Sequence, residues 1–372
     1  MKISIDGRAS TLYRGTGIGN YTYQLLNNIN NIDIINEYNL FISENSELDI
    51  NLNSNLRLTF SEKLMKKNFW NDIKEPNNIE LDSNIYHTPQ NGIGIIENID
   101  VPQIITLHDI IPLKMRETVS DNYLKLFDTE MPKILENTSG IITVSNFSKE
   151  DIHKTLGFPR DKIFVTHLAA ESQYKVLDKV ACKKFISDTY GISNDYILYV
   201  GGFSPRKNII GIIEAFSLIY SKLSKDIKLV IVGHKGISYE IYKNKAIELG
   251  IESKVIFTGF IEVNHMPAIY NAASLLVYPS FYEGFGLPPL EAMASGIPVI
   301  TSNITSIPEV VEGAAILINP YDSDDIASNI YNILTDEKFK NILIDKGLKQ
   351  ASKYNWRSTA IETILAYSKI AK

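Results

Sequence analysis

The sequence predicts an α/β protein built from two doubly wound, Rossmann-like domains. Its 372 residues suffice for two or three compact units, at roughly 150 residues a unit. Short apolar runs alternate with longer amphipathic stretches, which is typical of a parallel sheet covered by helices. The same rhythm occurs in both halves, so we expect one domain at 1–170, a second at 171–355 and a terminal helix at 356–372. The sequence leaves open whether this terminal helix returns to pack against the N-terminal domain.

Each apolar run is a candidate strand. In the first half the runs are Lys2–Asp6, Tyr38–Ile42, Asn84–His87, Gln103–His108, Gly140–Ser145 and Ile163–Thr166. In the second half they are Tyr196–Val200, Lys228–Val232, Val255–Thr258, Leu275–Tyr278, Val299–Thr301 and Ala315–Ile318. The amphipathic stretches predict helices, for example at Asn208–Lys222, Tyr239–Leu249, Pro289–Ala294 and Asp324–Thr335.

Composition and charge exclude several classes of protein. Hydrophobic residues make up 44% and charged residues 22% of the chain, which excludes a disordered or fibrous protein. The net charge of −6 argues against a nucleic-acid partner, because a polyanion needs a basic surface. With Cys182 as the single cysteine, neither an internal disulfide nor a zinc site of several thiolates can form.

The N-terminus and the hydropathy predict a cytoplasmic protein. The chain begins with one lysine and a short strand-like run, without the apolar stretch of a signal peptide. No uncharged apolar run approaches the ~18 residues of a membrane-spanning helix. A peripheral contact with the inner face of the cytoplasmic membrane stays open, and so does the oligomeric state.

A glycine-rich segment, Gly15–Gly19, follows the first strand and opens a helix. Its spacing does not match the dinucleotide-binding fingerprint, because Asn20 stands where the third glycine is required. Gly17 and Gly19 are therefore candidates for a binding loop in which a phosphate or a sugar approaches the backbone N–H groups. A tight strand-to-helix turn without a ligand is the alternative.

The segment Tyr278–Gly296 has the densest pattern of functional residues. A strand ends near its start, a loop with two glycines follows, and Pro288–Pro289 suits a first helical turn. Free N–H groups and the helix dipole at such a point attract an anion. Glu283 in the loop and Glu291 in the helix can accept hydrogen bonds from vicinal hydroxyls of a hexose and a ribose. In the alternative interpretation, Glu283 is solvated and Glu291 only complements the helix dipole.

A second candidate site follows the strand Tyr196–Val200. The loop contains Gly202 and Ser204, and then the adjacent cations Arg206 and Lys207. Arginine offers a planar fork and lysine a point charge, a pair suited to a diphosphate. Two solvated cations at the start of a helix would oppose the helix dipole, so we favour a binding role.

His108 and Asp109 come directly after an apolar strand and form a third candidate site. Ligands of α/β sheets bind at the carboxyl ends of strands, so we expect a role near the reacting carbon. His87 ends another strand and is a candidate for the acceptor side. Asp322 and Asp324 match a short metal-binding pattern but precede an amphipathic helix. We therefore interpret them as a helix cap and predict no catalytic metal.

Together these residues resemble the retaining glycosyltransferases of family 4, which have the GT-B fold. The spacing of Glu283 and Glu291 is similar to the E-x7-E motif of that family, and the surrounding stretch GFGLPPLEAMASG is specific to it. The resemblance covers nearly the whole chain and is strongest from Ile197 to Glu309. It implies two Rossmann-like domains that face each other across a deep cleft.

The resemblance also implies roles for the candidate residues, with the donor on the second domain and the acceptor on the first. Glu291 would hold the ribose and Glu283 the donor hexose, while His108 and Asp109 would lie near the reactive carbon. The contacts with the diphosphate and the base would come from Gly202, Ser204, Arg206, Lys207, Gly284, Phe285, Gly286, Leu287, Phe260 and Ile261. Many members carry arginine where this chain has Gly202, so phosphate binding rests more heavily on Arg206.

The activity that the resemblance implies is retaining transfer of a hexose from a nucleotide-sugar to a glycan or lipid-linked acceptor, without a metal or another cofactor. The motifs look most like those of bacterial mannosyltransferases of surface-polysaccharide assembly, such as that of lipopolysaccharide. GDP-mannose is therefore the first choice of donor, ahead of UDP-hexoses and dTDP-rhamnose. The alternatives are another GT-B enzyme that acts on nucleotide-sugars, such as an epimerase, and an inert nucleotide- or glycan-binding module.

Overall fold

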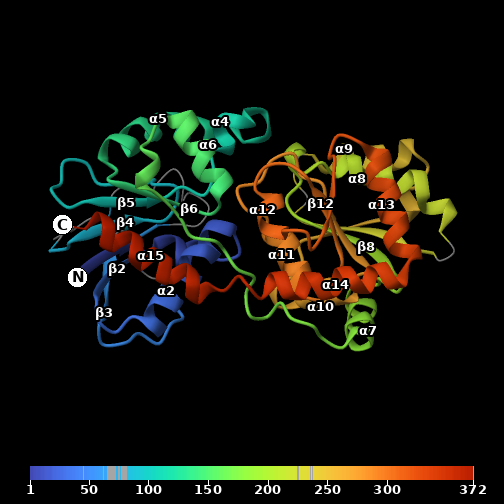
Figure 1. The fold of residues 1–372 in the computed structure, drawn as a ribbon, viewed down its shortest axis with the longest axis horizontal. Coiled ribbons are helices and arrows are strands. Elements are labelled where there is room, and N and C mark those ends of the chain that lie inside the picture. Colours follow the sequence, from blue (N-terminus) through green and yellow to red (C-terminus); the bar gives the residue numbers. More distant parts are fainter. Residues whose placement is uncertain are drawn as a thin grey trace. The chain divides into compact units, whose positions relative to one another are not determined.

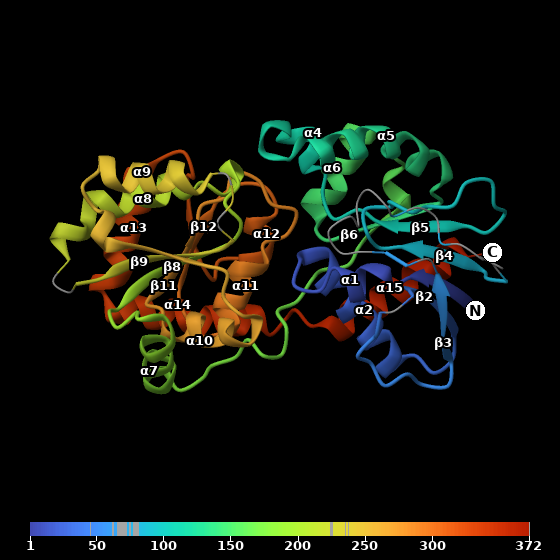
Figure 2. The ribbon, with the colours of Figure 1, turned by 180° about the vertical axis from the view of Figure 1, so that it is seen from behind.

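The chain folds into two compact units, each with one parallel sheet covered by helices (Figures 1 and 2). The computed structural model describes residues 1–44, 46–61, 63, 64, 73, 76, 82–223, 226–234, 236 and 238–371. Unit 1 contains Met1–Leu168 and Asn355–Lys372, and unit 2 contains Ala169–Tyr354. The predicted fold class, α/β with two Rossmann-like domains, is confirmed.

In unit 1 the parallel strands follow the order β3-β2-β1-β4-β5-β6-β7. The strands are β1 Lys2–Asp6, β2 Glu37–Ser43, β3 Leu56–Ser61, β4 Ile85–Thr88, β5 Gln103–Thr106, β6 Gly140–Thr143 and β7 Ile163–Val165. The helices are α1 Arg8–Leu12, α2 Gly17–Ile32, α4 Ile111–Lys114, α5 Asp121–Asn137, α6 Asn146–Leu156 and α15 Trp356–Ile370. β4, β5 and β6 are buried at every position because helices cover both faces of the sheet.

In unit 2 the parallel strands follow the order β10-β9-β8-β11-β12-β13. The strands are β8 Tyr196–Val200, β9 Lys228–Val232, β10 Val255–Gly259, β11 Leu275–Tyr278, β12 Val299–Ser302 and β13 Ile316–Ile318. The helices are α7 Lys179–Tyr190, α8 Ile209–Ile219, α9 Tyr239–Glu248, α10 Met266–Ala272, α11 Leu287–Ala294, α12 Ile307–Val311, α13 Ser323–Thr335 and α14 Glu337–Ala351. One continuous hydrophobic core joins this sheet to its helices.

The strand β3 is absent from the sequence-based prediction. It lies at the edge of its sheet, where β2 is its neighbour. Only its first and last residues, Leu56 and Ser61, are buried, so it lacks the continuous apolar run of a central strand. Two predicted strands are also too long, because β5 ends at Thr106 and β6 at Thr143. His108 therefore lies in a loop.

The helix α15 packs against α2 of unit 1, although it follows unit 2 in the sequence. Its Tyr367 hydroxyl lies 2.7 Å from Nδ1 of His87, and Nε2 of His87 lies 2.8 Å from the hydroxyl of Thr106. His87 is fully buried and both its ring nitrogens have partners inside unit 1. The expectation that His87 lines the acceptor side is therefore wrong, because its hydrogen bonds join α15 to the sheet.

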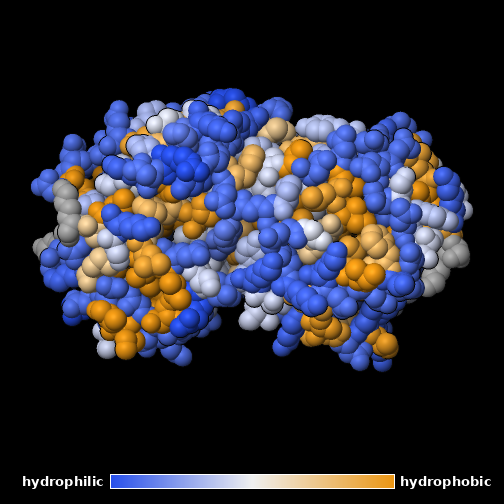
Figure 3. All heavy atoms as spheres, in the orientation of Figure 1, coloured by the Kyte–Doolittle hydropathy of each residue, from blue (hydrophilic) through white to orange (hydrophobic). Residues whose placement is uncertain are grey.

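The surface of the chain is mixed, with hydrophilic residues around separate hydrophobic patches on the face that Figure 3 shows. Exposed apolar side chains occur in both units, and Ile34 and Ile35, after α2, are 79% and 87% exposed. Single exposed apolar side chains are common on folded proteins. Within the part of the chain that the structure describes, no helix combines the length and the apolar character needed to cross a bilayer.

Candidate active site

The order of the strands places a candidate site at the carboxyl ends of β8 and β11. These strands are neighbours in the sheet, and the chain order reverses between them. In open α/β sheets, ligands bind outside the carboxyl ends of strands at such a reversal. The loop after β8 carries Arg206 and Lys207, and the loop after β11 carries Glu283. The fold therefore brings together two of the segments that the sequence singles out.

Arg206, Lys207 and Glu283 form a charge cluster. Nζ of Lys207 lies 2.7 Å from Oε1 of Glu283, and a guanidinium nitrogen of Arg206 lies 2.9 Å from the same oxygen. The hydroxyls of Tyr278 and Ser280 also donate to this oxygen, at 2.9 and 2.5 Å. The two hydroxyl donors were missed by the sequence analysis, because a tyrosine at a strand end and a loop serine are common in any fold.

The cluster keeps Glu283 ionised. Burial alone would raise the pKa of its carboxyl, but the charges of Lys207 and Arg206, with hydrogen bonds from Lys207 and Ser280, lower this pKa to about 2. The three side chains together carry one excess positive charge near neutral pH. Such a surplus attracts a phosphate group, for which arginine and lysine are the usual protein ligands. A phosphate at this position would compete with Glu283 for both cations.

The segment Gly284–Leu287 joins the cluster to α11. The hydroxyl of Ser306 lies 2.9 Å from the carbonyl oxygen of Phe285 and holds this loop in place. Gly286 has a φ angle of 117°, and a Cβ atom there would lie 2.6 Å from Ile307, so only glycine fits. No side chain of the described residues caps α11. Because Pro288 and Pro289 have no N–H group, the backbone donors that its start can offer to an anion are those of Gly286 and Leu287.

Glu291 lies on α11 and accepts a hydrogen bond of 2.7 Å from the hydroxyl of Tyr270 on α10. Burial raises the pKa of the Glu291 carboxyl to about 7, and the negative charge of Glu171 acts in the same direction. Hydroxyl groups of a ligand that donate to this carboxylate would stabilise its ionised form. Tyr270 was not predicted, because a tyrosine in a buried helix gives no signal of its own.

The other predicted donor residues lie in loops at the same edge of the sheet. Phe260 and Ile261 follow β10, two strands away from β8, and Phe260 is 70% exposed whereas Ile261 is buried. The carbonyl of Gly202 accepts a hydrogen bond from Tyr199. Ser204 precedes the short 3-10 helix that carries the two cations. Their contacts identify neither a base nor a sugar, so these roles stay predictions.

His108 and Asp109 lie in unit 1, in the loop between β5 and α4. Burial lowers the pKa of the His108 imidazole to about 4, so the ring is neutral near neutral pH. Its Nε2 atom has no hydrogen-bond partner among the residues that the structure describes. Oδ1 of Asp109 accepts a hydrogen bond of 3.0 Å from the N–H of Ile111, where α4 begins. Asp109 thus shapes the loop that carries His108.

Gly19 has a structural role at the start of α2. Its N–H group donates to the hydroxyl of Thr16, which caps the helix. A Cβ atom at Gly19 would lie 1.9 Å from the carbonyl oxygen of Tyr13, whereas nothing lies within 4 Å of one at Gly17. The structure therefore supports the tight turn at Gly19. A contact of Gly17 or Gly19 with a ligand stays a prediction.

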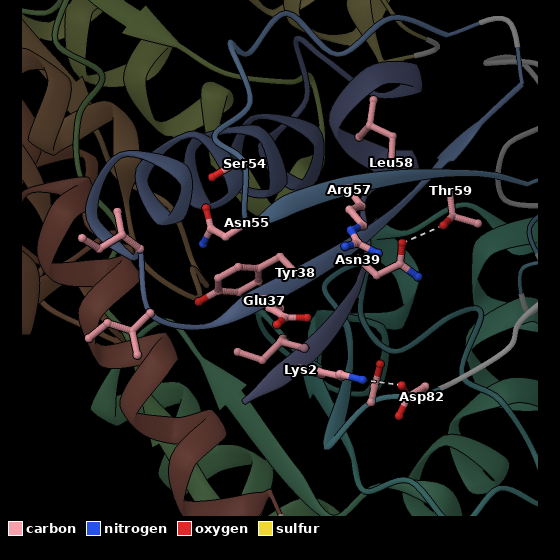
Figure 4. Close-up of a pocket in the computed structure, with 14 residues that line it drawn as sticks. Lys2, Glu37, Tyr38, Asn39, Ser54, Asn55, Arg57, Leu58, Thr59 and Asp82 are labelled. Atoms are coloured by element: carbon pink, nitrogen blue, oxygen red, sulfur yellow. Dashed lines mark hydrogen bonds and ion pairs between the residues drawn. The ribbon is translucent and has the colours of Figure 1, made fainter.

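A cavity of about 600 Å³ lies elsewhere in unit 1, toward the amino ends of β1, β2 and β3 (Figure 4). Its polar side chains bond to one another: Lys2 pairs with Asp82, and Thr59 donates to Asn39. None of the predicted site residues lines it. It lies away from the loops that carry the candidate residues, and we do not assign the active site to it.

Asp322, in the segment that matches a short metal-binding pattern, has the predicted structural role. The side chain of Asp322 caps α13 and accepts hydrogen bonds of 3.0 Å from the N–H groups of Asp324 and Asp325. The interpretation as a helix cap is confirmed. Among the described residues, no group of three or more histidine, cysteine, aspartate or glutamate side chains is arranged to hold a metal ion.

The chain has two Rossmann-like units, and two family models match it. Glycosyltransferase Family 4 matches residues 76–171, and Glycosyl transferases group 1 matches residues 185–350. These matches lie in unit 1 and unit 2, respectively, apart from the last residues of the first match.

Curated relatives with known names extend this result. The O-antigen chain mannosyltransferase B of Escherichia coli is 34% identical over 265 residues, which make up 71% of this chain and 69% of that protein. The serotype-specific mannosyltransferase WbdA of Escherichia coli is 30% identical over 74% of this chain. The chain spans only 34% of the length of WbdA.

Solved structures agree on the fold. Sucrose-phosphate synthase from Thermosynechococcus elongatus aligns over 99% of this chain and 98% of its own, with a TM-score of 0.77 and 19% identity. Anabaena HepE in complex with UDP and glucose aligns over 99% of this chain and 100% of its own, with a TM-score of 0.70 and 15% identity. Taken with the sequence matches, the chain belongs to the glycosyltransferases of family 4, with the GT-B fold.

Proposed function

We propose that this glycosyltransferase moves mannose from GDP-mannose to a glycan or lipid-linked acceptor in the assembly of a bacterial surface polysaccharide. The names of the relatives support the sugar and the pathway, since the O-antigen enzyme and WbdA are both mannosyltransferases. The single observation that carries a transfer role is the cluster of Arg206, Lys207 and Glu283 at the strand reversal of unit 2.

In the proposed reaction, the cations act on the leaving group. The bond between the anomeric carbon and the diphosphate oxygen breaks, and its electron pair goes to the diphosphate. Arg206, Lys207 and the first turn of α11 would stabilise this charge without a metal ion. Fixed charges that are in place before the reaction need no rearrangement when the charge develops, which makes them effective.

The two carboxylates would hold the donor, with Glu283 at the hexose and Glu291 at the ribose. Both accept hydrogen bonds when ionised, as neighbouring hydroxyls of a sugar require. The acceptor hydroxyl would attack the anomeric carbon on the face that the diphosphate leaves. Its proton would pass to the leaving phosphate oxygen. Because attack and departure occur on the same face, the configuration at the carbon would be retained. His108 of unit 1 would lie near this carbon.

The experiment that tests this proposal offers purified protein GDP-mannose, UDP-glucose and dTDP-rhamnose separately. We expect release of GDP from GDP-mannose, and a rise of the melting temperature with GDP that grows with its concentration. In this assay water takes the place of the acceptor, and the released sugar, followed by NMR before it mutarotates, should have the anomeric configuration of the donor. If the protein turns over only another donor, the sugar of that donor would replace mannose in the proposed reaction. An isomerised free nucleotide-sugar would indicate an epimerase, and binding without release an inert module.

Metal independence has its own measurement. We expect GDP release at the untreated rate in the presence of excess EDTA, because the charge on the diphosphate is met by Arg206 and Lys207. Addition of Mg²⁺ or Mn²⁺ after EDTA treatment is the control. A rate that falls with EDTA and returns with either cation would contradict the metal-independent reaction.

A further inference from the structure

The loop between β4 and β5 contacts the backbone of His108 through the side chain of Asn91. Asn91 and Gly92 lie in this loop, and both have positive φ angles, 53° and 77°. The strands β4 and β1 are neighbours at which the chain order of the unit 1 sheet reverses. A non-glycine residue with positive φ is uncommon, and such residues occur at functional sites more often than elsewhere. The conformation of Asn91 therefore calls for an explanation in its contacts.

Asn91 joins two parts of unit 1 through its side-chain amide. Its Oδ1 atom accepts a hydrogen bond of 3.1 Å from the N–H of His108. Its Nδ2 atom donates a hydrogen bond of 2.9 Å to the hydroxyl of Tyr123 on α5. Asn91 is only 8% exposed, so both bonds are shielded from water. One side chain thus ties the loop after β5 to a long helix.

The ring of His108 is held as well. The ring of Tyr21 on α2 meets it edge to face, with centroids 4.7 Å apart and an angle of 89°. The carbonyl of Pro89, in the same loop as Asn91, acts on this ring and raises its pKa, against the larger effect of burial. Nε2 of this ring is buried and has no hydrogen-bond partner among the described residues.

We propose that Asn91 is a positioning residue, which sets the place of His108 for the transfer reaction. This inference rests on the proposed function, in which His108 lies near the reacting carbon. Asparagine suits the task because its amide provides one acceptor and one donor and because it tolerates positive φ better than most residues. Displacement of a catalytic group by about 1 Å costs on the order of 100-fold in rate.

The main test compares three variants. Asn91→Gly keeps the backbone conformation accessible and removes both hydrogen bonds. Asn91→Asp keeps an acceptor for the N–H of His108 and offers another to the hydroxyl of Tyr123, so it is the conservative rescue. Asn98→Gly is the matched control, because Asn98 has a φ angle of 57° in the same unit but is exposed.

Two quantities are measured. Hydrogen–deuterium exchange of the peptide 104–110 reports the His108 amide without any substrate. Steady-state kinetics use whichever of GDP-mannose, UDP-glucose and dTDP-rhamnose the wild type turns over. For Asn91→Gly we expect faster exchange of the His108 amide, a fall in kcat of about 10- to 100-fold, and a KM for the donor within about threefold of wild type. Asn91→Asp should restore both, and Asn98→Gly should change neither.

The other outcomes separate this inference from the proposed function. In Asn91→Gly, faster exchange with the kcat of the wild type overturns the positioning role of Asn91 but leaves the transfer reaction intact. A loss of kcat without faster exchange has the same two consequences. Wild-type turnover in His108→Ala overturns the role of His108, and the inference with it. If Asn91→Gly does not fold, Tyr123→Phe, which removes one hydroxyl, must show faster exchange and a smaller loss of kcat; unchanged values overturn the inference.

Discussion

At the scale of single residues, the charge cluster of unit 2 is the feature with the most direct consequences. Glu283 pairs with two cations and accepts hydrogen bonds from two hydroxyls, so it is ionised and held in place. The sequence predicted Glu283, Arg206 and Lys207 as site residues from their places in loops. It could not predict that the glutamate would pair with both cations, because Glu283 lies 76 positions after Lys207, the nearer of the two in the sequence.

The first prediction concerns Lys207. We expect Lys207→Ala to lower kcat by about 10²- to 10³-fold, as loss of a preorganised charge donor does at the transition state. Arg206 still pairs with Glu283 in this variant, so the fold should persist. The control is Lys353→Ala, because Lys353 is 59% exposed and pairs with Glu312 at the surface. Wild-type turnover in Lys207→Ala would contradict the role of Lys207 in the reaction.

The second prediction concerns the pH dependence that Glu291 causes. Its pKa is about 7 in the folded protein and about 4.3 in an unfolded chain. The folded state therefore binds more protons between these values, and this contribution to stability is lost as the pH rises from about 4.3 through 7. Glu283 acts in a separate window, because its low pKa makes the loss occur as the pH falls below about 4.

The measurement compares the melting temperatures of the wild type and Glu291→Gln from pH 4.5 to 8. We expect the wild type to lose more stability than the variant across this range, since glutamine does not titrate. Glu291→Gln should also weaken the binding of GDP, which isothermal titration measures. If the melting temperatures of the two proteins changed with pH in parallel, this result would contradict the raised pKa of Glu291. Unchanged GDP affinity would count against a ribose contact.

At the scale of elements, the junction of α1 and α2 shows how one glycine is required and its neighbour is not. Gly19 packs against the backbone carbonyl of Tyr13, and Gly17 faces open space. From the spacing of the glycines alone, this segment was a candidate for binding a phosphate or a sugar, because a tight helix junction and a phosphate-binding loop both need glycine. Only the distances between backbone atoms identify the packing role at Gly19.

The third prediction follows from this contrast. We expect Gly19→Ala to lower the free energy of unfolding by about 2 kcal/mol or more, because a backbone carbonyl cannot move aside without disturbing α1. Gly17→Ala, the matched control, should stay within about 1 kcal/mol of the wild type. Urea denaturation of both variants measures the difference. A wild-type denaturation curve for Gly19→Ala would contradict the close packing.

At the scale of the whole molecule, the chain completes unit 1 with its last helix. α15 supplies Tyr367 to the buried hydrogen bond with His87, and Trp356 packs near Tyr21 with ring centroids 6.2 Å apart. The amphipathic pattern predicted a terminal helix but left its partner open. An apolar helix face fits against either sheet by pattern alone, so only the tertiary structure selects unit 1.

The fourth prediction is the effect of removing residues 355–372. Unit 1 then exposes the face of α2 that α15 covers, and Nδ1 of His87 loses its partner Tyr367, so we expect this unit to be cleaved rapidly by a protease. Unit 2 contains its own core and the charge cluster, so the truncated protein should still show a rise in melting temperature with GDP. Equal protease resistance with and without α15 would contradict this division of the chain.

The sequence by itself determined the α/β class, the central strands and the loops that carry the candidate donor residues. These features follow from local patterns, since buried parallel strands are continuous apolar runs and helix starts have their own signals. The tertiary structure alone decided that Glu283 shares one oxygen with two cations, that His87 is buried under α15, and that Asn91 bonds to His108. Each of these contacts joins residues that are separated in the sequence, and no local pattern encodes which of them will meet.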